Sequence, residues 1–143
     1  LKSAHFIMGK EHIEGGEFVI DMNSIKCTDI ENPEYAGKLE GHLKDNDFFG
    51  TETFPIATFT FAKVIFDGTS YLITGKMNIK GMSQEITFPA QFHTEEGILI
   101  ADAIVKIDRT KHDIKYGSGA FFDDLGDHMI LDDFTLNIHL VTE

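Results

Sequence analysis

The chain has few of the residues that build metal clusters, disulfide frameworks or membrane spans. Cys27 is its only cysteine, which excludes an internal disulfide and a thiolate metal cluster. The seven histidines show neither an HExxH motif nor another zinc spacing. No stretch approaches the roughly 20 apolar residues that a transmembrane helix needs. We therefore expect no metal, no other cofactor and no integral membrane segment.

Basic residues are also scarce, since 12 Lys and Arg stand against 24 Asp and Glu and give a formal net charge of −12. Such a surface repels nucleic acid and anionic membranes, so neither is a predicted partner. A chain of 143 residues is long enough for one domain that buries about two thirds of its extended surface. No linker or shift in composition divides it, and we expect a single acidic domain over residues 1–143.

The chain is rich in alternation of apolar and polar residues. Four consecutive segments between residues 56 and 108 alternate in this way, and short turns containing Gly68, Gly81 and Gly97 separate them. A period of two places one face of each strand in an apolar interior, and the glycines permit the positive φ angles of tight hairpins. The pattern predicts an antiparallel β-meander. Its inward residues are expected to be Ala57, Phe59, Phe61, Ile65, Tyr71, Ile73, Met77, Ile79, Ile86, Phe88, Ala90, Phe92, Leu99, Ala101, Ala103, Val105 and Ile107.

Three further segments extend this predicted sheet. Residues 17–22 and 129–142 alternate clearly, whereas residues 2–8 do so poorly and are assigned as a strand because they can pair with residues 17–22. Seven long strands in one small chain leave exposed edges unless the sheet curls and closes. We therefore predict an all-β fold, an antiparallel barrel in preference to a tight sandwich.

One short helix interrupts the strands. Ala36, Leu39 and Leu43 recur at helical spacing within residues 35–45, which predicts an amphipathic helix that caps one end of the barrel. Phe48 and Phe49 follow in a turn region and need burial. Sealing of the barrel end is favoured over direct ligand contact for these two rings.

A long irregular segment, residues 109–127, is too long for a hairpin turn and is typical of a lid or binding loop. It contains the candidate catalytic groups, His112 beside Asp113, and Ser118 with some histidine. No nucleophile motif such as GxSxG accompanies them. We therefore expect that the protein is not an enzyme, and a hydrolase using His112 and Ser118 is the least favoured alternative.

Several motifs in order resemble the YceI family. They are HLK at residues 42–44, DFF at 47–49, FPIATF at 54–59, YLITGKMNIKG at 71–81 and DR at 108–109. Each motif alone is loose, but their order and spacing are specific, and the resemblance covers essentially the whole chain. The family's usual first strand, with its G-x-H-x-G element, is not found in this sequence.

The resemblance implies a lipocalin-like barrel of about eight antiparallel strands, seven of them evident here, with one short capping helix and one long loop. It implies an apolar tunnel that binds a long isoprenoid lipid for carriage, storage or sensing, the lipid being a polyprenol, a polyprenyl phosphate or a quinone tail. It also implies a periplasmic or secreted location and allows a homodimer. The first strand and the leader would then be missing from residues 1–143.

Candidate ligand contacts fall into two groups on this interpretation. The tunnel residues are Phe18, Ile20, Phe59, Phe61, Ile73, Met77, Phe88, Phe92, Val105, Phe134 and Leu136. The mouth residues are His42, Phe48, Phe49, Arg109, Tyr116, Phe121 and Phe122. A structural ion pair with a nearby acid is an equal alternative for Arg109.

The residues alone leave two states of the interior open. Small residues that share a face with large ones, such as Ala57 beside Phe59, could leave a channel or interlock into a solid core. An eight-stranded barrel has the size at which either outcome occurs. A ligand-free barrel that acts as a protein-interaction module is therefore the second hypothesis.

Overall fold

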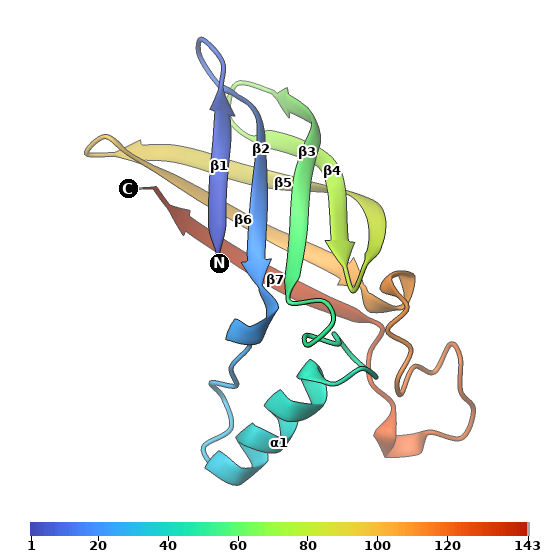
Figure 1. Ribbon diagram of the computed structural model, residues 1–143. Helices are drawn as coiled ribbons and strands as arrows, with labels where there is room; N and C mark the ends of the chain where they lie inside the picture. Colours follow the sequence, from blue (N-terminus) through green and yellow to red (C-terminus); the bar gives the residue numbers. More distant parts are fainter. Residues whose placement is uncertain (143) are drawn as a thin grey trace.

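The computed structural model describes residues 1–142 and contains, within them, seven strands, one α-helix and three short 3₁₀ helices. The strands are β1 (Ser3–Met8), β2 (Ile13–Asp21), β3 (Ile56–Phe66), β4 (Tyr71–Ile79), β5 (Met82–Glu95), β6 (Ile98–Asp108) and β7 (Asp133–Val141). Each strand pairs antiparallel with its neighbour in sequence. Strands β1 to β4 run side by side, and β5 to β7 cross them obliquely (Figure 1). The all-β, antiparallel fold is confirmed, as a sheet curled into a half-barrel.

Strand β5 carries the sheet around its corner. Residues 82–90 pair with β4, and residues 90–95 pair with β6. Along an antiparallel ladder, every second residue directs its N–H and C=O groups to the same neighbouring strand. Met82, next to the two-residue hairpin, is directed to β4. Pro89 is an odd number of residues further along, so its backbone nitrogen faces β6. Proline has no N–H to donate there, and the pairing with β6 starts only at the next residue. Beyond this point β5 and β6 separate, and the sheet folds over on itself.

The sheet stays open along one side. Strands β1 and β7 are its two ends, and within residues 1–142 neither has a second strand as partner. Leu1, just before β1, and Leu140 on β7 line the same cavity, so the two edges border one opening. The eighth strand expected from the resemblance is not among the described elements.

The concave face of the sheet holds the alternating apolar residues, as the sequence predicts. Phe59, Ile73, Val105 and Ile107 are almost completely buried. The Phe59 ring lies at the centre, with ring centroids 5.4 Å from Phe61 and 5.2 Å from Phe88. Full burial of a large apolar side chain contributes roughly 1.5–3 kcal/mol, so this face supplies most of the stabilisation of the fold.

One inward residue was predicted wrongly. Ile65 is 45% exposed, because the register of β3 against β4 shifts between Phe61 and Lys63. A shift of one residue exchanges the two faces of a strand. Val64 therefore packs against the core in its place.

The predicted capping helix is present as α1 (Pro33–Lys44), beginning two residues earlier than expected. The side chain of Asn32 accepts hydrogen bonds from the backbone N–H groups of Glu34 and Tyr35, and Pro33 occupies the first turn. Both features favour a helix start at this point. The helix lies across one end of the half-barrel (Figure 1).

The long loop extends further than predicted, because β7 begins at Asp133 and not at residue 129. Its ends carry the 3₁₀ helices η2 (Arg109–His112) and η3 (Gly126–His128); a third, η1 (Met22–Ser24), follows β2. The Ile130 N–H donates to the Gly117 carbonyl at 2.8 Å. Residues 129–132 therefore belong to the loop.

We predict that Gly75→Ala destabilises the protein by about 1–3 kcal/mol in a denaturant titration. A Cβ at this position would overlap the Phe59 ring and lie 2.5 Å from the backbone oxygen of Thr60, which cannot move aside as a side chain could. Gly37→Ala is the matched control, because nothing lies within 4 Å of its Cβ position in α1, and it should stabilise by about 0.5–1 kcal/mol. Equal stability of Gly75→Ala and the parent would contradict this packing.

Candidate functional site

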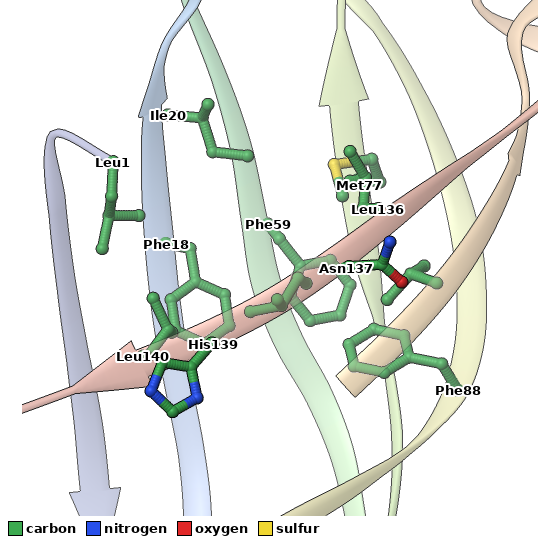
Figure 2. Close-up of a pocket in the computed structure, with 12 residues that line it drawn as sticks. Leu1, Phe18, Ile20, Phe59, Met77, Phe88, Leu136, Asn137, His139 and Leu140 are labelled. Atoms are coloured by element: carbon green, nitrogen blue, oxygen red, sulfur yellow. The ribbon is translucent and has the colours of Figure 1, made fainter. Parts of the chain in front are cut away.

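Two apolar cavities adjoin inside the half-barrel. One has a volume of about 230 Å³ and the other, nearer α1, about 240 Å³. Both are lined by Ile20, Met77 and Leu136, so they adjoin across these side chains, between β2 to β4 and β7, and together they are called the channel. Figure 2 shows the first cavity, with Phe18 and Phe59 from the vertical strands facing β7. Side chains therefore leave part of the interior unfilled.

Most of the predicted tunnel residues lie along this channel. Those that line the first or the second cavity are Phe18, Ile20, Phe59, Met77, Phe88, Val105, Phe134 and Leu136. Ile73 and Phe92 line a much smaller void of about 10 Å³ beyond it. Phe61 is not among the lining residues and packs its ring against Phe6, Phe18 and Phe59. Contact of any of these residues with a ligand stays a prediction.

Other lining residues were not among the predicted contacts. Met22, Ile25 and Ala57 line the second cavity, and Ile138 and Leu140 line the first. Alternation in the sequence contained the signal for Ala57, Ile138 and Leu140. Ile25 lies after η1 in an irregular segment, and no periodicity could have indicated it.

An aromatic cluster adjoins the second cavity through Phe49. His42 lies edge-on to Tyr116, with ring centroids 4.5 Å apart, and 5.2 Å from Phe48. Phe48 is buried, and Phe49 lines the second cavity while its ring packs against Phe134 at 6.0 Å. The Arg109 guanidinium lies 5.4 Å from the centre of the Phe48 ring. The structure thus brings five of the seven predicted mouth residues together, from the helix, the following turn and the long loop.

Phe121 and Phe122 do not join this cluster. Each is 51% exposed, and the Lys115 ammonium lies 5.1 Å from the centre of the Phe121 ring. Phe122 donates its backbone N–H to the Ser118 carbonyl at 3.0 Å. These two rings lie on the surface of the long loop, away from the channel lining.

Arg109 is only 2% exposed and lies at the base of the long loop. Its guanidinium donates hydrogen bonds of 2.8–2.9 Å to the carbonyl oxygens of Ile114, Tyr116, Ile130 and Leu131. Burial lowers the pKa of this group, and the carboxylates of neighbouring Asp132 and Asp108 oppose the shift; arginine nevertheless remains charged. Arg109 therefore ties both ends of the loop together through its backbone.

The ion pair considered for Arg109 is also present. An Asp132 carboxylate oxygen lies 3.6 Å from the guanidinium, too far for a hydrogen bond but close enough for charge attraction. That oxygen has no hydrogen-bond partner among the described residues. The carboxylate thus compensates a buried charge whose donors are directed to carbonyl groups.

Residues 3–142 match the sequence model of the YceI-like domain. The chain belongs to the YceI-like family. A UPF0312 protein of Vibrio vulnificus is 28% identical over 95 residues, an alignment that covers 61% of this chain and 50% of that protein. The curated relatives are longer proteins, of whose length the alignments cover 28% to 50%.

Solved structures share the fold of this YceI-like domain. The crystal structure of Burkholderia cenocepacia BcnA superposes with a TM-score of 0.78 at 24% identity, covering 99% of this chain and 83% of that chain. The crystal structure of a Campylobacter jejuni YceI protein gives a TM-score of 0.71 at 21% identity, covering 99% and 81%. The family names of these relatives denote no enzymatic activity.

The candidate catalytic residues of the YceI-like domain are not arranged as a pair. His112 is buried, and its Nδ1 lies 2.9 Å from the Met82 carbonyl oxygen. The Ser118 hydroxyl oxygen is also buried and accepts a hydrogen bond from the Ala120 N–H. No hydrogen bond joins His112 to Ser118 within residues 1–142. His112 instead contacts the backbone at the start of β5, and Ser118 contacts the backbone of its own loop.

No helix within the described residues is long and apolar enough to cross a membrane. Nowhere in residues 1–142 do three side chains of the types His, Cys, Asp or Glu gather in a way that could hold a metal ion. The two adjoining apolar cavities are the site inside the half-barrel that the described residues offer to a ligand.

We predict that Arg109→Lys destabilises the domain by about 2–4 kcal/mol, because a lysine cannot reach four carbonyl groups with one planar fork. Amide hydrogen exchange of residues 113–132 should accelerate more than that of β2 to β4. Lys106→Arg is the control, since its ion pair with Asp133 is exposed, and stability should change little. Unchanged exchange in the loop of Arg109→Lys would refute the tying role.

Proposed function

We propose that this YceI-like domain binds a long isoprenoid lipid in its apolar channel, for carriage, storage or sensing. The observation that carries the proposal is the pair of adjoining cavities, of about 230 and 240 Å³, that apolar side chains line but do not fill. A solid core would have left no such space. The proposed tunnel contacts are the predicted residues that line these cavities.

The channel suits a ligand that is bound through area. Ile20, Met77 and Leu136 present only hydrocarbon and thioether surface where the two cavities join. Burial of each CH₂ group is worth roughly 0.8 kcal/mol, so a few isoprene units offset the cost of ordering a flexible chain. A branched and repetitive tail makes the same kind of contact at every point along the channel, which supports an isoprenoid of variable length.

The proposal includes a role without catalysis and a location in the periplasm or outside the cell. Family membership supports both statements. A carrier of this kind also accounts for the absence of a paired nucleophile and base at His112 and Ser118 within the described residues. A homodimer is compatible with this role.

Native mass spectrometry of the protein purified from its own host tests the proposal directly. We expect a stoichiometric adduct, and solvent extraction should release a molecule whose mass is built from isoprene units. An empty protein that also takes up no added polyprenol or quinone would disprove the lipid role. A barrel that acts as an interaction module through its acidic surface would then be the better account.

Filling the channel should weaken binding. Leu136→Phe adds volume where both cavities meet, and we expect affinity for a polyprenol to fall at least about tenfold, which corresponds to about 1.4 kcal/mol. Thr135→Val is the control, because its side chain lies on the outer face of the same strand. Thermal unfolding establishes that both variants are folded. Undiminished binding by folded Leu136→Phe would place the ligand elsewhere.

A further inference from the structure

Three phenylalanine rings form a row across the interior, which we call the aromatic row. They are Phe18 from β2, Phe59 from β3 and Phe88 from β5, with consecutive ring centroids 6.2 and 5.2 Å apart. All three line the first cavity and none lines the second, which is nearer α1. Figure 2 shows the rings in line, with Ile20 and Met77 to one side of them. The row therefore borders the channel at the end that lies away from α1.

Little free space remains behind the aromatic row. Phe18 and Phe88 also line the next void, which holds about 10 Å³, a volume at the limit for one water molecule. No part of an isoprenoid tail fits there. Further on, the Phe92 ring lies 5.3 Å from that of Phe6 and 4.8 Å from that of Tyr71. Packed side chains thus support the row from behind.

A wall of this kind limits how much of a tail the channel can bury. Phenylalanine rings carry no hydrogen-bonding atom, so a polar head group placed against them would lose its water without a replacement. The hydrocarbon end of the tail is therefore the part that meets the row. Each CH₂ group that enters the channel raises affinity about fourfold, whereas a unit that stays in water adds no burial. Affinity should rise with tail length only until the channel is full.

Phe88 is the ring of the row that can be altered with the least disturbance. It is buried and borders both the first cavity and the small void. The void continues past it between the small side chains of Ala90 and Ala103. Phe88 packs against one ring, that of Phe59, whereas Phe18 packs against three. Truncation of Phe88 would join the void to the channel and keep most of the aromatic contacts.

We infer that the aromatic row, through Phe88, sets the number of isoprene units that this domain buries. The inference rests on the proposed function and deepens it. The ligand class becomes a prenyl chain whose buried part has a fixed length, while any further units remain outside the channel.

A length series tests the inference. Native mass spectrometry of the protein with an equimolar mixture of all-trans prenols of three to nine isoprene units ranks their affinities in one spectrum, because successive adducts differ by one unit in mass. For the parent protein we expect occupancy to rise with length and to level off within the series. Phe88→Ala should level off at least one unit later, and the first additional unit should raise affinity about tenfold or more.

Phe61→Ala is the matched control. The Phe61 ring lies 5.4 Å from Phe18 and from Phe59, but it lines neither the channel nor the void. This variant should lower the unfolding temperature, as Phe88→Ala does, and should level off at the same length as the parent. Phe88→Leu is the milder variant if Phe88→Ala does not fold, and the next unit should then raise affinity about threefold or more.

The outcomes distinguish this inference from the function on which it rests. If no prenol binds, the proposed lipid function itself fails. If prenols bind but the affinity of the parent rises up to the longest member, or if the folded Phe88 variant levels off where the parent does, the limiting role of the row is overturned and the lipid function stands. An equal shift in Phe61→Ala would also overturn it, since general loosening of the core would then explain the effect.

Discussion

The interior of this YceI-like domain depends on the change of partner along β5. A flat sheet of seven strands would present two open faces to water, and its alternating phenylalanines would remain half exposed. Because Pro89 cannot donate a hydrogen bond toward β6, the pairing there ends, and β6 and β7 cross over β2 to β4. The crossing encloses an apolar volume between β2 to β4 on one side and β6 and β7 on the other, which are connected only through β5. Every later feature of the site, the cavities included, lies within that crossing.

The crossing also explains why the enclosed volume is not filled. At the centre the absence of a side chain at Gly75 lets the Phe59 ring lie against β4, where a Cβ would overlap it. This ring and Phe88 pack closely, 5.2 Å apart, but toward the helix the facing residues are smaller or more flexible, such as Ala57 and Met77. Their side chains do not span the separation of the strands. The channel is thus a consequence of residue size along a sheet whose curvature is set at its corner.

Sequence alternation predicted the strands and nearly all inward residues, because a period of two is a local property that folding preserves. It failed where a backbone irregularity has no local signature. At the bulge between Phe61 and Lys63 the two faces of β3 change places, so Val64 and not Ile65 packs against the core. Hydrogen bonds from Arg109 and Ile130 keep residues 129–132 in the loop and out of β7. Asn137 and His139 could not be predicted as lining residues of the first cavity either, since alternation correctly assigns them to the outer face.

The distribution of positive charge bears on which head group such a channel can hold. A bound phosphate needs a cation whose hydrogen-bond donors are free. Near α1, the cations of the long loop direct their donors to other groups of the protein. Arg109 directs its guanidinium to four carbonyl oxygens, and Lys115 lies 2.9 Å from the Asp113 carboxylate. Lys80, from the neighbouring hairpin, donates to the Asn46 carbonyl oxygen at 2.6 Å. If one of these cations turned toward a ligand, the carbonyl or carboxylate groups that it now contacts would lose their partner. A single phosphate contact would have to outweigh that cost. These three cations are therefore already compensated by groups of the fold itself.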